Sequence, residues 1–124
     1  MDVRLKRAYE PVAAEDGSRV LVERLWPRGV TRERARLDEW AKEIAPSPEL
    51  RRWYAHDPAR FAEFRRRYLG ELAGHEQELE ELRRRARAGT LTLVYAARDE
   101  ERNSAVVLAE VLRAGSGKSK KASK

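Results

Sequence analysis

Two short apolar runs, separated by a long stretch of helical periodicity, dominate the pattern of hydrophobic and polar positions. Residues 19–26 contain Val20-Leu21-Val22, and residues 26–29, Trp-Pro-Arg-Gly, then break the strand and turn the chain. Residues 91–97, Leu-Thr-Leu-Val-Tyr-Ala-Ala, form the second run. Short runs rich in β-branched and aromatic residues are typical of buried strands. The pattern predicts two core strands, and we expect the fold to be organised around residues 19–29, the first of these strands and the loop that follows it.

Between these strands, apolar residues recur every three or four positions, which is the period of an amphipathic helix. The predicted helices are a short one from Thr31 to Arg36, one over 37–44, one after Ser47, one after Asp57 with an apolar stripe to Leu72, and one with apolar residues from Leu79 to Ala86 that ends at Gly89. A last helix is expected after Asn103. Ser47, Asp57 and Asn103 are preferred N-cap types, and Pro48 and Pro58 suit the first helical position.

The N-terminal segment 3–9 alternates apolar and polar residues, the period of a half-buried strand. After the turn signal at 15–17, the link to the next strand either closes an antiparallel hairpin or holds one helical turn that allows a parallel arrangement. The order of the predicted elements is a strand, a long helical crossover, a second strand and a helix. This order predicts an α/β fold, in which a small, mostly parallel β-sheet is flanked by helices in a single domain. The domain is expected over residues 1–114, and a disordered, lysine-rich tail over 115–124.

The composition excludes several kinds of chemistry. The chain of 124 residues has no cysteine, which rules out disulfides, thiolate nucleophiles and cysteine-ligated metals and favours a cytoplasmic location. No apolar run approaches a membrane span and the N-terminus does not resemble a signal peptide, so we expect no membrane association. The net charge is +6, but the tail holds four lysines and no acid, which leaves 23 basic against 21 acidic residues in the rest of the chain.

Ligands of open α/β sheets bind beyond the carboxyl ends of the strands. Here those ends carry Arg24, Trp26 and Arg28 after the first core strand and Arg98 and Asn103 after the second. Guanidinium groups suit phosphate and carboxylate, a helix that begins after Asn103 adds free N–H groups, and Trp26 is placed to wall a pocket. These five residues are the predicted ligand-binding site. The alternative is that the arginines pair with nearby acids and only lock the loops.

His56 and Asp57 are the candidate catalytic residues. His56 is the only plausible proton carrier near the predicted site, and Asp57 beside it orients the local turn. Asp57 is also explained as a helix cap. His56 and His75 are the only imidazoles, and neither belongs to a motif with metal-ligand spacing, so we predict no metal and no cofactor.

Four short sequence motifs occur in a characteristic order along the chain. They are Arg-Leu-Trp-Pro-Arg-Gly (24–29), Trp-Tyr-Ala-His-Asp-Pro (53–58), Phe-Arg-Arg-Arg-Tyr (64–68) and Leu-Val-Tyr-Ala-Ala-Arg-Asp (93–99). In this order they resemble the YeaO-like family, domain of unknown function 488, over about Val3 to Arg113. The resemblance implies a small, cytoplasmic, bacterial α/β domain with no assigned activity. Longer relatives carry a Cys-His pair in the loop after the last strand, and this chain has Asn103 and Ser104 at the matching positions.

These observations predict a protein that binds an anionic small molecule at the carboxyl ends of the core strands, either as a binding protein or as an enzyme. The alternative is a non-catalytic interaction module that makes weak nucleic-acid contacts through the basic tail. The arginine runs at 51–52, 65–67 and 83–85 support this alternative unless nearby glutamates balance them as solvated helix faces. The identity of the ligand and the oligomeric state stay open at this point.

Overall fold

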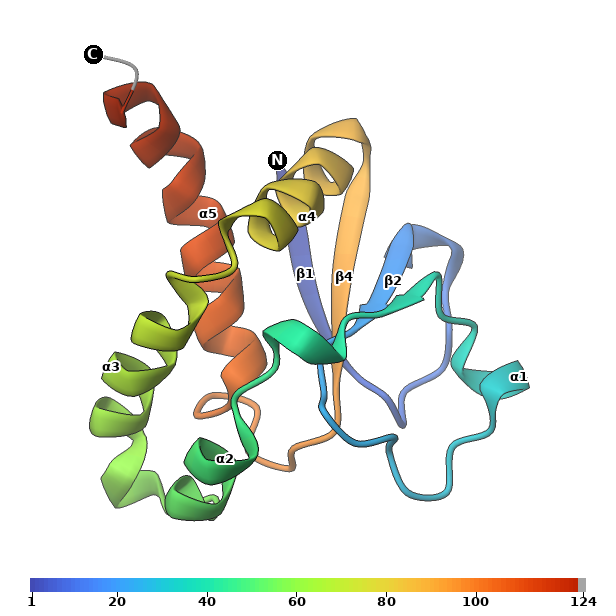
Figure 1. Cartoon of the computed structure of the whole chain (residues 1–124). Coiled ribbons are helices and arrows are strands. Elements are labelled where there is room, and N and C mark those ends of the chain that lie inside the picture. Colours follow the sequence, from blue (N-terminus) through green and yellow to red (C-terminus); the bar gives the residue numbers. More distant parts are fainter. Residues whose placement is uncertain (123–124) are drawn as a thin grey trace.

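The computed structural model describes the backbone of residues 1–122 and the side chains of residues 1–115. Four parallel strands form one sheet in the order β1-β4-β2-β3 (Figure 1). They are β1 (Asp2–Arg7), β2 (Ser18–Leu21), β3 (Glu39–Trp40) and β4 (Thr90–Tyr95). The fold is α/β with a small parallel sheet and flanking helices, as the sequence predicts. The open question about the first strand is also answered, because β1 pairs in parallel with β4 and not with β2.

The described helices begin close to the predicted caps. They are α1 (Arg32–Ala35), α2 (Pro48–Tyr54), α3 (Phe61–Leu72), α4 (Glu76–Ala88) and α5 (Ser104–Ala122), with single turns η1 (Ala14–Asp16), η2 (Lys42–Ile44) and η3 (Pro58–Arg60). The side chains of Ser47 and Asn103 each accept a hydrogen bond from the backbone N–H three residues ahead, at 3.2 and 2.9 Å. Asp57 also serves as a cap, but of the turn η3 that leads into α3. These three caps confirm the predicted helix starts.

The central strand of the sheet is β4, which corrects the expectation that residues 19–29 organise the fold. β4 pairs on both sides, with β1 and with β2, and all residues from Leu91 to Tyr95 are buried. A continuous buried run is typical of a parallel strand inside a sheet. β2 is shorter than predicted: Val22 N–H still donates to Val94 O (3.0 Å), and two charged residues then lead the chain away.

Residues 37–44 do not form the predicted helix. They form the edge strand β3 and the single turn η2. The sheet uses their backbone, because Asp38 N–H donates to Arg19 O and Ala41 N–H donates to Leu21 O, each at 2.8 Å. These long-range hydrogen bonds outweigh a helical period that only four apolar residues support.

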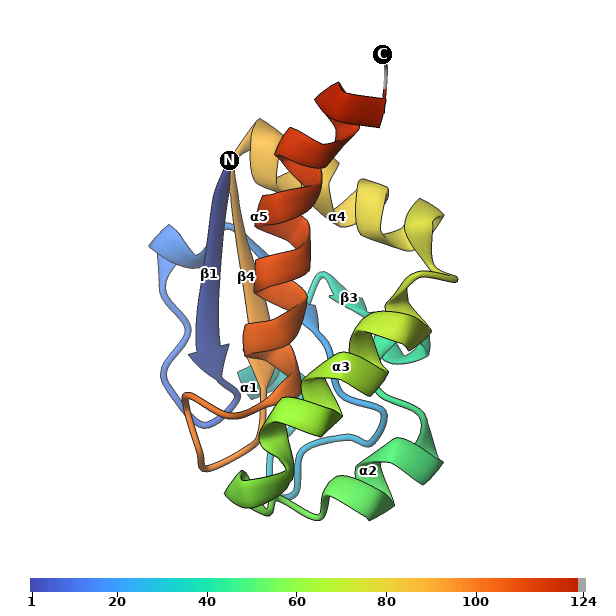
Figure 2. The ribbon, with the colours of Figure 1, turned by 90° about the vertical axis from the view of Figure 1, so that its left-hand side faces the viewer.

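The two faces of the sheet are covered differently. On the helical face, α3, α4 and α5 pack over the strands, and Figure 2 shows α5 crossing in front of them. The opposite side, here called the loop face, is covered by the irregular segments 8–17 and 23–38 and the short α1 (Figure 1). Buried charges lie beneath these loops, where Asp16 pairs with Arg19 (2.7 Å) and with Lys6 (3.0 Å). The main apolar core therefore lies on the helical face alone. Its members include Phe64, Tyr68, Leu72, Leu79, Leu91, Leu93, Leu108 and Leu112.

Side chains cover the outer edge of β1. Arg113 donates through Nη2 to Val3 O (2.7 Å), and Glu10 accepts through Oε2 from Arg7 N–H (3.0 Å). Backbone groups near both ends of this edge are therefore already bonded.

The helix α5 continues past Gly115 to Ala122. The side chains of residues 116–124 and the backbone of 123–124 lie outside the described residues. The disordered, lysine-rich tail over 115–124, and the nucleic-acid contact assigned to it, therefore stay predictions. In the part of the chain that the structure describes, no helix combines the length and the apolar character that crossing a membrane requires.

Candidate functional site

Two of the predicted ligand-binding residues, Arg24 and Trp26, hold the loop after β2 in place. The Arg24 guanidinium donates to two carbonyl oxygens of the turn before α2, at 2.9 and 3.2 Å. The Trp26 indole N–H donates to Val30 O (2.6 Å), and its ring meets the Trp40 ring edge-on with 5.4 Å between centroids. Both side chains have structural partners, and none of these is an acid. A ligand-binding role for them stays a prediction.

The other three predicted ligand-binding residues differ in whether their side chains already have hydrogen-bond partners within the protein. Asn103 is 3% exposed; its side chain caps α5 and also donates to Asp99 O (2.8 Å). Arg28 and Arg98 are exposed, and neither has a hydrogen-bond or ion-pair partner among the described residues. Of the five, only these two arginines leave their whole guanidinium group free to meet a ligand.

The candidate catalytic residues, His56 and Asp57, lie at the exposed corner between α2 and η3. Ala55 and His56 both have positive φ angles, 50° and 56°, a conformation that is strained for residues other than glycine. The Asp57 carboxylate accepts from Ala59 N–H (3.0 Å) and lies 3.6 Å from Arg60 Nε. A catalytic role for the pair stays a prediction. Within the described residues, no group of three or more His, Asp or Glu side chains is placed to hold a metal ion.

Glu23, which the sequence pattern did not single out, joins the carboxyl ends of β2 and β4. Its carboxylate accepts from Ala96 N–H, one residue beyond β4 (2.9 Å). Burial raises the pKa of Glu23, while this hydrogen bond and the positive charges of Arg51 and His56 oppose the rise. The sequence signal that could have identified Glu23 is its position directly after three apolar strand residues, because a carboxylate at the end of a buried strand is itself partly buried.

The arginines of α3 and α4 are all ion-paired, each with a carboxylate at 2.9 Å or less. The pairs are Arg65–Glu110, Arg66–Glu63, Arg67–Glu63, Arg83–Glu76, Arg84–Glu81, Arg85–Glu39 and Arg87–Glu80. Hydrogen bonds from two guanidinium groups lower the pKa of Glu63 to about 2. The basic runs at 65–67 and 83–85 are therefore balanced by glutamates.

The loop face shows the opposite arrangement over residues 28–36. This segment contains one acid, Glu33, and four exposed arginines, Arg28, Arg32, Arg34 and Arg36. Among the described side chains, no carboxylate lies within ion-pair distance of these four. The Arg32 guanidinium instead lies over the Trp26 ring, 4.9 Å from its centroid. We call these four residues the unpaired arginines.

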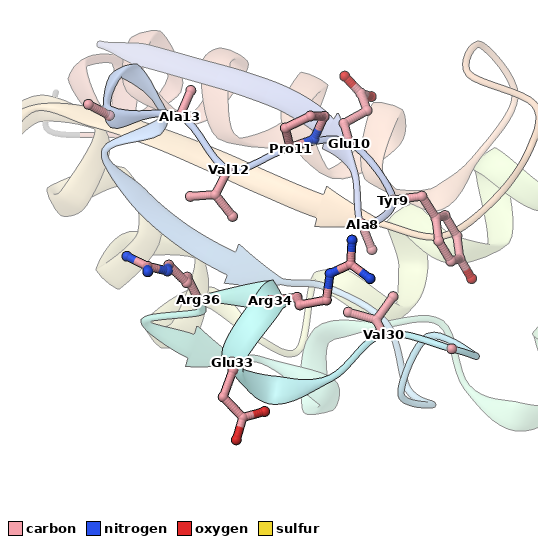
Figure 3. A pocket seen from close by; sticks show the side chains of 12 residues that line it. Ala8, Tyr9, Glu10, Pro11, Val12, Ala13, Val30, Glu33, Arg34 and Arg36 are labelled. Atoms are coloured by element: carbon pink, nitrogen blue, oxygen red, sulfur yellow. The ribbon is translucent and has the colours of Figure 1, made fainter.

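A cleft of about 780 Å³ opens on the loop face, between residues 8–14 and residues 29–36. In Figure 3, Val12 from the first segment and Arg34 from the second point into the space between the two segments, and Val30 lies farther along, toward Tyr9. The cleft lies next to the loops that leave the carboxyl ends of β1 and β2. Its volume is in the range of small-molecule sites, and apolar side chains with a few charged ones are the usual lining of such sites.

The charges at this cleft are arranged in favour of an anion. Arg34 points into the opening and Arg36 stands at one end, whereas the Glu33 carboxylate points away (Figure 3). Glu10 is the other acid of the lining, and its carboxylate is already bonded to Arg7 N–H. The Arg34 guanidinium therefore faces the cleft and Arg36 lines one end of it, while both acids of the lining are turned away or engaged.

A second hollow of about 310 Å³, beside Arg24, is a structural joint. The Glu71 carboxylate accepts from both the backbone N–H (2.9 Å) and the hydroxyl (2.6 Å) of Ser47. The Tyr68 hydroxyl donates to Ile44 O (2.6 Å), and burial raises the pKa of Tyr68. These bonds connect α3 to the start of α2, so the polar side chains of Arg24, Ser47, Tyr68 and Glu71 in this hollow already have partners.

The chain is similar to bacterial proteins along almost its whole length. A family model, DUF488-N3i, described as "Inactive DUF488-N3 subclade", matches residues 2–124. "Uncharacterized protein YeaO" of Escherichia coli (strain K12) is 48% identical over 113 residues, which cover 91% of this chain and 98% of that protein. "Uncharacterized protein Mb3100c" of Mycobacterium bovis and "Uncharacterized protein Rv3073c" of Mycobacterium tuberculosis are each 46% identical over 111 residues, covering 89% of this chain and 92% of the relative. No solved structure matches the chain.

Proposed function

The chain belongs to the YeaO-like DUF488 family, in the subclade described as inactive, and from this premise we propose that it binds an anionic ligand in the cleft on its loop face. The ligand lies between residues 8–14 and 29–36. Arg34 and Arg36 bind its negative charge, and Val12 and Val30 contact its apolar part.

The observation that carries this proposal is the contrast between paired and unpaired arginines. All arginines of α3 and α4 have a glutamate within 2.9 Å, so on these two helices every guanidinium has an acidic partner. The unpaired arginines lie beside the larger cleft and have no such partner among the described side chains. A guanidinium without a protein partner keeps its planar fork of donors available for phosphate or carboxylate.

The proposal is one of binding and assigns no catalytic residue. The subclade is described as inactive, which favours binding over turnover. His56 and Asp57 lie at the corner between α2 and η3, outside the lining of the cleft. Among the residues predicted from sequence, Arg28 directly precedes the cleft lining at Gly29, and we assign it to the entrance. Arg24 and Trp26 fix the loop after β2, and Asn103 caps α5 away from the lining of the cleft.

The test is a thermal-shift screen of the full chain, followed by calorimetry, with pyrophosphate, sulfate, nucleoside monophosphates and dicarboxylates as ligands. A ligand at a hundred times its Kd stabilises the folded state by about 2.7 kcal/mol, which raises Tm by several degrees in a domain of this size. We expect such a shift for at least one phosphate-bearing ligand. We expect it to disappear in the double variant Arg34→Ala, Arg36→Ala.

The matched control is the double variant Arg66→Ala, Arg84→Ala. It removes the same charge from exposed arginines, with side chains 73% and 63% accessible, that already have glutamate partners. We expect it to keep the ligand-induced shift. An equal loss in both double variants would show that net charge, and not the cleft, attracts the ligand, and the proposal would then be wrong.

A further inference from the structure

We infer that the anion bound in this cleft is a stretch of single-stranded nucleic acid. This inference rests on the proposed function and specifies its ligand. The folded domain would then make the nucleic-acid contact itself, at a site separate from the lysine-rich tail.

The first observation is that the arginines are spread along one wall of the cleft. In Figure 3, Arg36 lies at one end, Arg34 faces the middle, and Val30 lies toward the other end. Arg28, an exposed arginine, directly precedes the lining residue Gly29 in the chain but does not itself line the cleft. Guanidinium groups that converge on one point suit a compact anion. A row of them suits a ligand with charges at intervals, such as consecutive phosphates.

The second observation is an exposed aromatic ring in the cleft lining. Tyr9 is 48% exposed and lies at the Val30 end of the cleft in Figure 3. The Arg7 guanidinium covers it, 5.0 Å from the ring centroid. Arg7 is in turn fixed by hydrogen bonds to the carbonyl oxygens of Ala97 (2.8 Å) and Ala96 (3.3 Å). A ring held on one side by a fixed cation and open to solvent elsewhere offers a stacking surface for a base.

The third observation is backbone strain at an arginine of the cleft. Arg36 ends α1 with φ at 46°, in the left-handed region that usually favours glycine at this position. Arginine has none of the conformational freedom that lets glycine adopt this backbone conformation without strain. Strain of this kind is often kept where the side chain serves a ligand, and Arg36 lines the cleft.

A single strand fits these features better than a duplex. Stacking on Tyr9 requires a base that is free of its neighbours, which a single strand provides. The segment beside the cleft has only the four-residue helix α1, which is too short to read a major groove as recognition helices do.

The test is fluorescence anisotropy with a labelled oligothymidine of about ten nucleotides, within the site sizes of single-strand binders. The protein is the full chain in which Lys118, Lys120, Lys121 and Lys124 are changed to glutamine, so that tail contacts do not contribute. We expect binding that weakens steeply between about 50 and 200 mM salt. In this background, Arg34→Ala with Arg36→Ala should weaken binding at least tenfold. It should also reduce the salt slope by about 1.4, because each lost phosphate contact on a single strand contributes about 0.7.

The stacking role of Tyr9 is tested separately. Tyr9→Ala should weaken binding to the oligothymidine by about fivefold or more, which corresponds to the loss of one stacked base. The same variant should bind an abasic oligonucleotide of equal length as well as the parent does. Arg66→Ala with Arg84→Ala serves as the charge control and should leave the affinity within about twofold, as expected where no phosphate contact is lost.

The outcomes separate the two proposals. A Tm shift from a small phosphate ligand that depends on Arg34 and Arg36, without oligonucleotide binding or without an effect of Tyr9→Ala, would overturn the nucleic-acid inference and leave the anion-binding proposal in place. If no phosphate ligand shifts Tm and no oligonucleotide binds, both proposals are wrong. An equal weakening in the charge control would assign the binding to net charge and overturn the inference as well.

Discussion

The helical face and the loop face of this sheet use arginine in opposite ways. On the helical face, the arginines of α3 and α4 neutralise glutamates and connect helices to one another. On the loop face, the unpaired arginines have no described carboxylate partner, and two of them, Arg34 and Arg36, line a cleft. The segment 28–36 contains four arginines and one glutamate, whereas α3 and α4 together contain seven arginines and six glutamates, so these helices bring acids for their own basic residues. The lesson is that pairing, and not the number of basic residues, locates a candidate anion site.

The largest expected effect tests the structural role of arginine on the helical face. Arg83 is 3% exposed, and its guanidinium donates to Leu112 O and Val111 O, each at 3.2 Å, besides its pair with Glu76. Arg83→Met keeps the apolar stem but removes these charged donors, so we expect the free energy of unfolding to fall by about 3 kcal/mol. Urea unfolding followed by circular dichroism measures it. The exposed neighbour Arg84 is the control, and Arg84→Met should cost less than about 0.5 kcal/mol.

Equal losses in Arg83→Met and Arg84→Met would break the first half of the comparison. The arginines of the helical face would then be interchangeable surface charges, without the graded structural role that their burial implies.

The next prediction concerns the loop face. Arg36→Gly relieves the left-handed backbone conformation at the end of α1, so we expect the protein to become more stable by about 1 kcal/mol. The same variant should bind the anionic ligand more weakly, because it also removes a guanidinium from the cleft. Denaturant unfolding and calorimetry on the same sample measure both quantities. A variant that gains stability and keeps its affinity would show that Arg36 has no part in binding.

A smaller effect should appear in the pH dependence of stability. Burial raises the pKa of Glu23 above its unfolded value near 4.5, so the folded protein holds this proton more tightly than the unfolded chain. The stability from this group is fully present below pH 4.5 and is lost as the pH rises through the raised pKa. Glu23→Gln still offers an oxygen to Ala96 N–H and removes this loss. The difference in unfolding free energy, variant minus parent, should therefore increase from pH 4 to pH 7. Urea unfolding of both proteins at several pH values across that range measures it. An unchanged difference between the two proteins would contradict the prediction.

The smallest effect concerns an exposed carboxylate of the helical face. The pKa of Glu63 is lowered to about 2 by hydrogen bonds from Arg66 and Arg67. The stability that this group contributes is present above its unfolded pKa of 4.5 and is lost as the pH falls toward 2. NMR titration of the Glu63 side chain should give a midpoint near 2 in the parent and an ordinary one in Arg66→Ala with Arg67→Ala. Equal midpoints would mean that these ion pairs do not persist in solution.

Much of the fold could be predicted from the sequence because its signals are local. Ser47, Asp57 and Asn103 accept backbone hydrogen bonds two or three residues ahead, so each cap is visible in a short window. The elements that were missed depend on distant partners. Residues 37–44 have a helical period, yet their backbone is bonded to β2, and β4 becomes central only because β1 and β2 pair on either side of it.

The candidate site was harder to predict for the same reason. Arg65 finds Glu110 and Arg85 finds Glu39, so the pairs that neutralise these arginines span more than 40 positions of sequence. Nothing local distinguishes them from Arg34, which has no such partner among the described residues. The sequence therefore placed the arginine site at Arg24 and Arg28 on the logic of strand ends. The structure shows that Arg24 is held by carbonyl groups and that the available guanidinium groups continue along the segment to position 36.

The covered edge of β1 has a consequence for how the protein behaves at high concentration. An exposed edge strand is a template on which a second molecule can add a strand, and such additions lead to aggregation. In this protein an incoming strand must first displace Arg113 from Val3 O and Glu10 from Arg7 N–H. Each displacement removes a charge-assisted hydrogen bond before any new pairing is gained. The sheet is therefore protected against growth at this edge by two side chains, one from the loop after β1 and one from α5.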